Sequence, residues 1–229
     1  MMSSTARDFS VRVLQSTQSA VGDTGTTDVT GIADLLDIAL GCGVADYAGV
    51  CEQDPHLPGS FTTVAPTHHL VRAADRQQLH NQHGPYRQTR SQLGVLTSPD
   101  VAADARWPLW GPAAAALGIG SVMSVALRGR RTFGAVTFYT ATPRPPTADQ
   151  IAQAAVIATS ISIVLASRPV RALITSPRSR DQIGQAQGIL MQQHQLTADE
   201  ALDMLRRLCH DDNRTLADLA GSVVDGWAS

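Results

Sequence analysis

One stretch near the middle of the chain decides the fold of its larger part: Ser121-Val-Met-Ser-Val-Ala-Leu127, Arg128-Gly-Arg-Arg131 and Thr132-Phe-Gly-Ala-Val-Thr-Phe-Tyr-Thr140. The first and third segments are rich in β-branched and aromatic residues. The short segment between them contains a glycine, which tolerates the positive φ that tight turns require. The stretch therefore predicts a β-hairpin, and so an antiparallel sheet.

Shorter elements precede this hairpin. Thr30 caps a run of apolar residues at helical spacing that ends at Gly41 and Gly43, which predicts a first helix. The remaining predictions, in chain order, are strands at residues 47–52 and 60–65 that form a hairpin, a helix over 67–82 that stops at Gly84-Pro85, a strand at 95–96 and a short helix over 113–117.

A long apolar helix follows the hairpin. Thr147-Ala-Asp-Gln150 is a capping box that opens a helix over residues 148–166. The resulting order of elements predicts an α+β domain over residues 30–166, with an antiparallel sheet flanked by helices. Its first and last helices are both apolar enough to bury together. Because such helices often pack into an intermolecular bundle, we expect a homodimer.

The segments on either side of this domain differ in composition. Residues 1–29 mix Ser, Thr, Gly and Asp with few apolar anchors, so we expect a flexible N-terminal arm in which residues 9–14 could pair locally. Residues 167–178 contain Pro169, Pro177 and three arginines without an acidic residue. This composition predicts a positively charged linker.

Residues 179–229 have the pattern of helices only. Three amphipathic stripes follow one another, the second opened by the capping box Thr197-Ala-Asp-Glu200 and the third capped by Asn213 or Thr215. A segment of about 50 residues can hide three such stripes only against one another. We therefore predict an all-α three-helix bundle.

Composition excludes several classes of protein. All 18 basic residues are arginine, and the absence of lysine removes Schiff-base, phosphate-loop and protein-kinase mechanisms that need one. The formal net charge of −2 gives no general case for polyanion binding. Three widely spaced cysteines and a polar start without a signal peptide indicate a cytoplasmic protein with free thiols. Neither apolar stretch, at 107–127 or 151–166, supplies the ~20 continuous apolar residues of a membrane span.

Three C-terminal motifs carry a family resemblance. They are Ser179-Arg-Asp-Gln-Ile-Gly-Gln-Ala-Gln-Gly-Ile-Leu-Met191, Leu196-Thr-Ala-Asp-Glu-Ala201 and Asn213-Arg-Thr-Leu-Ala-Asp-Leu-Ala220. Together they resemble the ANTAR domain of bacterial transcription antiterminators. The region upstream resembles the GAF sensor domains that are joined to ANTAR domains in actinobacteria, through Gly84-Pro85, Arg106-Trp107-Pro108, Ala114-Ala-Ala-Leu-Gly-Ile-Gly-Ser-Val122 and Phe133-Gly-Ala-Val-Thr-Phe-Tyr139.

The resemblance implies a cytoplasmic transcription antitermination regulator. The GAF domain senses a signal, for example a small molecule, and the ANTAR domain binds tandem stem-loops in nascent RNA. A dimer suits such RNA, because two bundles can engage two adjacent loops. Small residues such as Ala186 and Gly188 let the backbone approach a loop, while cations meet the phosphates. No enzymatic activity, cofactor or metal ion is implied.

Motif positions outside the apolar stripes give the expected RNA-binding residues: Arg180, Gln187, Gly188, Asn213 and Arg214. The chain departs from the family at two of its usual basic positions, where it has Gln187 and Thr215. Residues 178–229 contain five arginines against eight acidic residues, a formal net charge of −3. Each lost phosphate contact removes roughly 0.7 from the salt slope of single-strand binding. One alternative is therefore a GAF dimer that acts as a signalling or protein-interaction module, with an ANTAR bundle that has lost RNA affinity. A thiol-based GAF enzyme similar to methionine sulfoxide reductases is the other alternative.

Other groupings of residues have simpler interpretations. Five of the seven histidines, His56, His68, His69, His80 and His83, lie close together in sequence, but no carboxylate or cysteine at ligand spacing accompanies them. We interpret them as surface or capping residues. Cys42 and Cys51 resemble the thiols of GAF-fold methionine sulfoxide reductases, and we interpret them as packed core thiols. Arg128, Arg130 and Arg131 are expected at a solvated hairpin tip.

Overall fold

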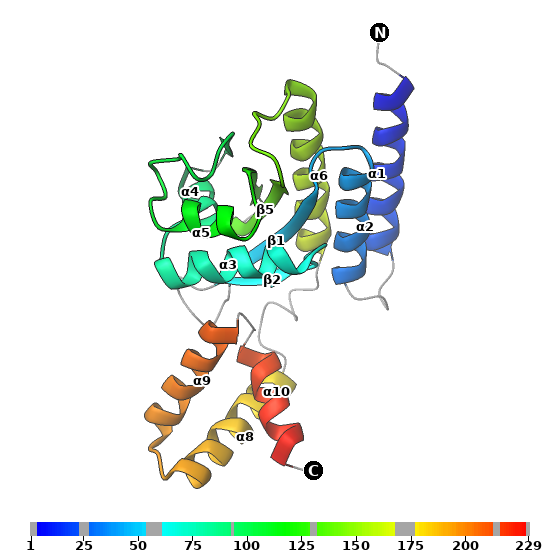
Figure 1. Ribbon diagram of the computed structural model, residues 1–229. Helices are drawn as coiled ribbons and strands as arrows, with labels where there is room; N and C mark the ends of the chain where they lie inside the picture. Colours follow the sequence, from blue (N-terminus) through cyan, green and yellow to red (C-terminus); the bar gives the residue numbers. More distant parts are fainter. Residues whose placement is uncertain are drawn as a thin grey trace. The chain divides into compact units, whose positions relative to one another are not determined.

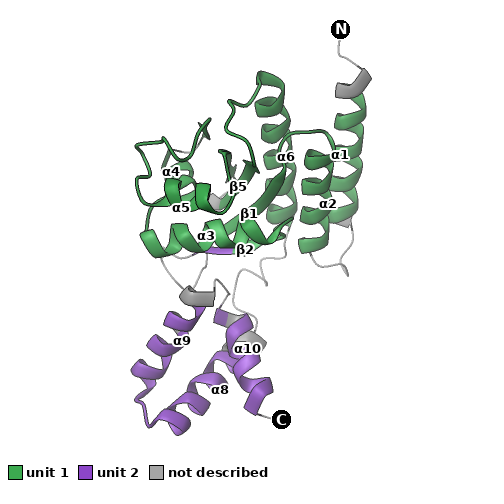
Figure 2. Cartoon of the chain, in the orientation of Figure 1, with its two compact units in different colours: residues 1–52, 63–167 green, residues 53–62, 168–229 purple. Residues whose placement is uncertain are grey.

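The computed structural model describes most of the chain. The described residues are 4–22, 28–53, 61–92, 94–128, 132–167, 177–212 and 216–227. The chain divides into two compact units, coloured separately in Figure 2. Residues 1–52 and 63–167 form the N-terminal unit, and residues 53–62 and 168–229 belong to the C-terminal unit. The predicted linker lies mainly in residues 168–176, outside the described residues.

A five-stranded sheet forms the centre of the N-terminal region, in the order β2-β1-β5-β4-β3. The strands are β1 (Tyr47–Gln53), β2 (Phe61–Val64), β3 (Val95–Ser98), β4 (Ser121–Arg128) and β5 (Thr132–Thr140). The β1–β5, β4–β5 and β3–β4 pairs are antiparallel. The predicted hairpin is confirmed as β4 and β5, with Val125 opposite Val136; its turn, residues 129–131, is not among the described residues.

Alternate residues of each strand enter two separate cores, because successive side chains of a strand point to opposite faces. Met123, Val125 and Phe138 belong to the core beneath α1, α2 and α6. Val122 and Tyr139 belong to the core beneath α3 and α5. Helices thus cover both faces of the sheet, as Figure 1 shows.

The first face carries α2 (Asp28–Gly41) and α6 (Ala148–Ser167), as the apolar patterns predict. The capping box of α6 is present, since Thr147 N donates to Gln150 Oε1 at 2.9 Å and Gln150 N donates to Thr147 Oγ1 at 3.2 Å. In length and composition α6 could cross a membrane. One side of it is instead buried in the sheet core through Ile157, Ile161 and Val164. We interpret α6 as a core helix.

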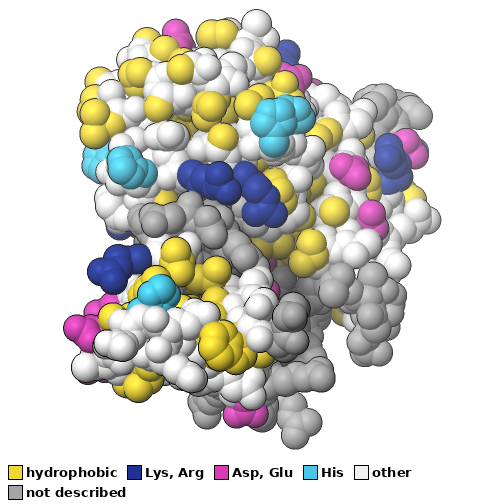
Figure 3. Space-filling view, turned by 60° about the horizontal axis from the view of Figure 1, so that its bottom comes forward, with side chains coloured by type: hydrophobic (Ala, Val, Ile, Leu, Met, Phe, Trp, Pro, Cys, Tyr) yellow, Lys and Arg dark blue, Asp and Glu magenta, His cyan; other side chains and the backbone are white. Residues whose placement is uncertain are grey.

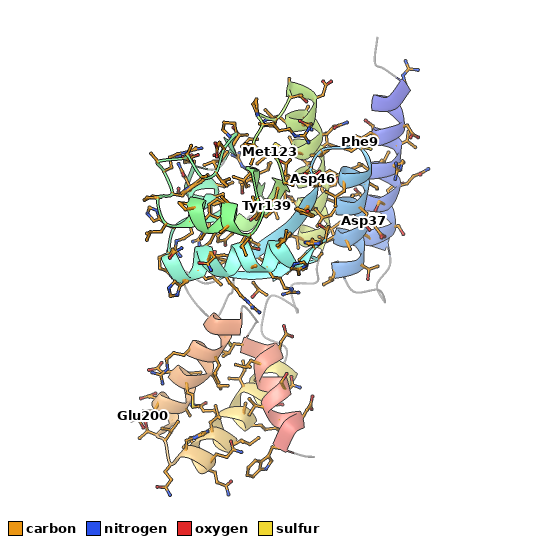
Figure 4. The ribbon with its side chains drawn as sticks, viewed as in Figure 1. Phe9, Asp37, Asp46, Met123, Tyr139 and Glu200 are labelled. Atoms are coloured by element: carbon orange, nitrogen blue, oxygen red, sulfur yellow. The ribbon has the colours of Figure 1, made fainter. Side chains whose placement is uncertain are left out.

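The predicted flexible arm is wrong for residues 4–22, which form the helix α1 (Ser4–Gly22). Phe9 and Val13 are 4% and 2% exposed and belong to the same core as α2 and α6. Figure 4 shows Phe9 on the side of α1 that faces these helices. In the sequence alone, this polar segment contains too few apolar residues to predict a buried helix. Tertiary packing of one narrow stripe stabilises the helix.

The second face carries α3 (His69–Asn81), α4 (Pro85–Gln92) and α5 (Trp110–Ala116). The sequence predicts α3 and α5 but takes Gly84-Pro85 only as a stop. Pro85 instead begins α4, because proline is favoured in the first turn of a helix. Contacts with distant residues hold this polar helix: Tyr86 N donates to Gln78 Oε1 at 2.9 Å, and Trp107 Nε1 donates to Gln88 Oε1 at 3.0 Å.

In the described part of the C-terminal unit, three helices share one core: α8 (Pro177–His194), α9 (Ala198–Asp212) and α10 (Leu216–Trp227). The predicted three-helix bundle is therefore present. Ala186, Leu190, Leu205 and Ala220 are at most 5% exposed. Pro177 begins α8, so the helix starts two residues before the predicted domain boundary, again at a position that suits proline.

Candidate nucleic-acid interface

The exposed side of α8 presents two glycines. Gly184 and Gly188 are one turn apart and both exposed, and a Cβ atom built on either would meet no atom within 4 Å. Ala186, by contrast, is 0% exposed within the bundle core, so the expectation that it lets a loop approach the backbone is wrong. The backbone of α8 is instead accessible to another molecule at Gly184 and Gly188.

Gln187 connects two helices of the bundle. Its Nε2 donates a hydrogen bond of 2.6 Å to the carbonyl oxygen of Ala198, the first residue of α9. The side chain is half-buried. This position therefore has a structural role within the bundle that the sequence did not reveal.

The other predicted RNA-binding residues have less defined surroundings. Arg180 lies in the first turn of α8, and its side chain is not among those described. Asn213 and Arg214 lie between α9 and α10, outside the described residues. The structure brings Arg180, Gln187 and Gly188 together on α8.

The capping box of α9 is confirmed. Thr197 N and Thr197 Oγ1 donate to Glu200 Oε2 at 2.8 and 2.7 Å, and Glu200 N donates to Thr197 Oγ1 at 3.4 Å. These hydrogen bonds hold the pKa of Glu200 below its ordinary value. The bond from the Thr197 backbone N–H has the largest effect, followed by that from the Thr197 side chain. Figure 4 shows Glu200 on the outside of the bundle.

A buried carboxyl group lies at the centre of the second face of the sheet. Asp75, on α3, is 0% exposed. Four side chains donate to it: Thr63 Oγ1 at 2.7 Å and Cys51 Sγ at 3.3 Å to Oδ2, and Gln78 Nε2 at 3.0 Å and Tyr139 OH at 3.2 Å to Oδ1. We call these five residues the Asp75 cluster. It joins α3 to β1, β2 and β5, so one network of hydrogen bonds fixes the helix on the sheet.

Burial sets the protonation of this cluster. It raises the pKa of Asp75 above its ordinary value, and the four hydrogen bonds act in the opposite direction. Burial, together with the neighbouring Asp75, holds the pKa of the Cys51 thiol well above its usual range. Cys51 is thus protonated at neutral pH, which is unfavourable for a nucleophile.

An open groove of about 480 Å³ lies beside α4. Its lining residues include His83, Arg87, Arg106 and Trp107. The Arg106 guanidinium forms hydrogen bonds to both carboxylate oxygens of Asp104 and lies 4.7 Å from the centroid of the Trp107 ring. Hydrogen bonds from Arg106 lower the pKa of Asp104 to about 2.

The two units are similar to different known proteins. Residues 171–224 match the family model of the ANTAR domain. No curated protein sequence matches the chain. The GAF domain of an Acinetobacter phosphoenolpyruvate-protein phosphotransferase is similar in structure, with a TM-score of 0.55, 10% identity and coverage of 72% of this chain and 95% of that one.

Two further solved structures have the same fold. The GAF domain of the Coxiella burnetii phosphoenolpyruvate-protein phosphotransferase has a TM-score of 0.54 at 10% identity, over 75% of this chain and 99% of that one. The free methionine-R-sulfoxide reductase of Neisseria meningitidis has a TM-score of 0.51 at 13% identity, over 73% and 93%. The chain thus joins a domain of the GAF fold to a segment that matches the ANTAR domain model. At such identities the structural matches show the GAF fold alone.

The described surface of the ANTAR domain is acidic. Its described charged side chains between residues 181 and 227 are Asp181, Asp199, Glu200, Asp203, Asp218 and Asp225, all exposed, and Arg207. Phosphate contacts depend on cations. The described part of the ANTAR domain therefore offers few groups for neutralising an RNA backbone.

The described histidines near α3 show no arrangement for binding a ligand, and His56 lies outside the described residues. His68 caps α3 by accepting a hydrogen bond from Leu70 N at 3.3 Å, and it stacks on Tyr47. His80 and His83 do not share a helix face, because α3 ends at Asn81. Among the residues that the structure describes, no group of three His, Cys, Asp or Glu side chains could hold a metal ion.

Proposed function

We propose that this protein is an RNA-binding regulator of transcription antitermination. In this proposal the ANTAR domain binds tandem stem-loops in a nascent transcript, and the GAF domain receives a signal. The match of residues 171–224 to the ANTAR family supports the RNA-binding class, and the fold of the N-terminal unit supports a sensor. We place the protein in the cytoplasm, where nascent bacterial transcripts are.

One observation carries the proposal most strongly: the two open glycines on the exposed side of α8. A glycine inside a helix costs about 1 kcal/mol relative to alanine. Gly184 and Gly188 incur this cost twice in the interior of one helix, although no neighbouring atom within 4 Å requires either, whereas the equally open Gly226 lies at the end of α10. An external surface that must approach the helix backbone explains both, and an RNA loop with splayed bases is such a surface.

The proposed RNA-contacting set is centred on Gly188. Arg180 and Gln187 lie on the same helix, and Asn213 and Arg214 precede α10. Gln187 acts here as a positioning residue, because its amide group holds the start of α9 against α8. Arg180 and Arg214 supply charge to the phosphates.

We further propose that the protein is a homodimer. On α1, Val11, Leu14 and Val21 are 52%, 59% and 42% exposed, at spacings of three and seven residues. On α6, Val156 and Ile163 are 42% and 48% exposed and seven residues apart. Seven-residue spacing of apolar residues is typical of helix–helix interfaces. Because α1 and α6 pack against each other, a second copy could cover both stripes in a four-helix arrangement.

We also propose that the protein is not an enzyme. Cys51 is 0% exposed, and its raised pKa keeps the thiol protonated. Tyr139 and Asp75 are buried and bonded to each other. These groups stabilise the domain rather than face a substrate.

A second candidate function is a signalling module whose ANTAR domain has lost its RNA affinity. The exposed acidic residues of that domain favour it. Binding of the full chain to a tandem stem-loop RNA, compared with a single stem-loop of the same sequence, separates the two candidates.

The sharpest variant is Gly188→Gln, with Gly226→Gln as its matched control. Both glycines are exposed in helices, and both would accept a Cβ without contact. We expect wild type to prefer the tandem RNA, Gly188→Gln to lose at least about tenfold in affinity, and the control to bind as wild type does. Circular dichroism establishes that both variants fold. Equal binding by the two variants would contradict the RNA-contacting role of α8, and no tandem binding by wild type would favour the second candidate.

A further inference from the structure

The exposed side of α3 in the GAF domain is basic. His69, Arg72, Arg76 and His80 are all exposed and follow one another at intervals of three, four and four residues, so they lie on one side of the helix. We call them the α3 basic stripe. The single acidic residue of α3, Asp75, is 0% exposed and lies on the side of the helix that packs against the sheet. Figure 3 shows arginine and histidine side chains close together on this face of the molecule.

The surrounding sequence strengthens this asymmetry. Between residues 61 and 98 the chain contains Arg72, Arg76, Arg87 and Arg90, and Asp75 is its one acidic residue. Among the described residues, the structure gives an ion pair between Arg106 and Asp104. Within that described part, neither Arg72 nor Arg76 has a carboxylate partner. Their charges are therefore available to an external anion.

The fold holds this stripe rigidly. Val71, Ala74 and Leu79 are buried, and a Cβ at Gly49 of β1 would lie 2.6 Å from Val71 Cγ1, so the helix lies directly on the sheet. The Asp75 cluster bonds the middle of α3 to three strands. Arg72 and Arg76 thus project from a fixed helix, one turn or about 6 Å apart along its axis.

The basic surface continues beyond the end of α3. Gln82 and His83 line the groove beside α4, and Arg87 and Arg106 line it as well. Trp107 is another lining residue, with the Arg106 guanidinium held over its ring. A cationic helix side that leads to a groove lined by arginine suits a nucleic-acid strand, since phosphates meet guanidinium groups.

We propose that the α3 basic stripe is a second RNA-contacting surface, which binds the phosphate backbone of the same RNA that the ANTAR domain recognises. This inference rests on the proposed function. RNA is favoured over an acidic protein because residues 178–229 carry a formal net charge of −3, so cations elsewhere in the chain would add to the phosphate contacts of Arg180 and Arg214. In this arrangement the ANTAR domain reads the loops, and the GAF domain supplies electrostatic affinity that carries no sequence information.

The test is the salt dependence of RNA binding by the full chain. Wild type is compared with Arg72→Ala/Arg76→Ala, using tandem stem-loop RNA with single-stranded flanks. Loss of two phosphate contacts is expected to reduce the slope of log K against log salt by about 1.4 and to weaken binding at least tenfold at about 0.1 M salt. Arg72→Lys/Arg76→Lys keeps the charge and should retain most of the slope.

Arg12→Ala/Arg144→Ala is the matched control. Both residues are exposed and lie outside α3 and the α1 apolar stripe, and the variant changes the net charge by the same amount. We expect its slope to equal that of wild type. An equal fall in affinity for both double variants would mean that only net charge matters, and it would overturn the inference.

Gly188→Gln, measured in the same assay, separates this inference from the proposed function. If Gly188→Gln weakens binding and Arg72→Ala/Arg76→Ala does not, the α3 surface contacts something other than RNA and the inference fails while the function stands. If only the double arginine variant weakens binding, the α3 surface binds RNA and the proposed RNA-contacting role of Gly188 fails. If wild type binds no RNA, both fail.

Discussion

The Nε2 atom of Gln187 donates a hydrogen bond of 2.6 Å to the carbonyl oxygen of Ala198. This bond joins the middle of α8 to the first residue of α9. It gives a structural reason for a glutamine where the family resemblance implies a lysine. The amide reaches the carbonyl from a half-buried side chain, whereas a cation there would lose part of its hydration.

Gln187→Ala is expected to lower the free energy of unfolding of the ANTAR domain by about 1 kcal/mol, because one hydrogen bond between helices is lost. Urea denaturation followed by circular dichroism measures this free energy. Gln185→Ala, at the exposed neighbouring position, is the control and should leave stability nearly unchanged.

Gln187→Lys is expected to strengthen RNA binding severalfold and to increase the salt slope of that binding by roughly 0.7, because it adds one cation. Unchanged RNA affinity of the lysine variant would show that position 187 does not face the phosphates.

Asp75→Asn is expected to change the pH dependence of stability of the GAF domain. The folded pKa of Asp75 is raised above the ordinary value of 3.8, so its contribution to stability is fully present below that value and is lost as pH rises through the folded pKa. Wild type therefore loses stability across this window relative to the variant, which has no titrating group at this position. Fluorescence of Trp107 and Trp110, which are 1% and 0% exposed, follows unfolding of this domain. Parallel pH profiles for the two proteins would contradict this account.

Glu200→Gln is expected to act in the opposite direction and in the other domain. Because its hydrogen bonds with Thr197 lower the folded pKa of Glu200, its contribution is present above the ordinary value of 4.5 and is lost as pH falls through the folded pKa. The variant should lose less helical signal than wild type on acidification. Circular dichroism of both proteins from neutral to acidic pH checks this, with Asp199→Asn, at the neighbouring exposed position, as the control. A control that behaves like Glu200→Gln would argue against a specific capping role.

Leu14→Glu combined with Ile163→Glu is expected to convert a dimer into a monomer, because it places charges on both proposed apolar stripes. Each native side chain is about half exposed in the single chain, so the monomer fold should persist. Light scattering after size-exclusion chromatography measures the mass. Ser19→Glu, on another side of α1, adds a charge outside the stripe and should remain dimeric. A wild-type protein that is already monomeric would refute the proposed interface.

Elements with a strong periodic pattern could be predicted from the sequence. The hairpin of β4 and β5, the apolar helix α6 and the capping boxes at Thr147 and Thr197 depend on contacts between near neighbours, so their residues specify them locally. Two helices were missed because local pattern does not stabilise them. Phe9 and Val13 of α1 gain their burial from α2 and α6, and α4 is held by bonds from Gln78 and Trp107.

The sequence by itself determined that this chain joins an α+β domain to a three-helix bundle, since hydrophobic periodicity and helix caps report which residues must be buried. It also gave the candidate RNA-binding residues through motif positions, of which Arg180, Gln187 and Gly188 lie on α8. Only the tertiary structure decided which of their neighbours face solvent. It buried Ala186, left Gly184 and Gly188 open, tied Gln187 to Ala198, and buried Asp75 against the sheet while it left Arg72 and Arg76 of the same helix exposed. The physical reason is that the exposure of a side chain depends on segments distant in sequence that pack against its helix, and local pattern does not specify that packing.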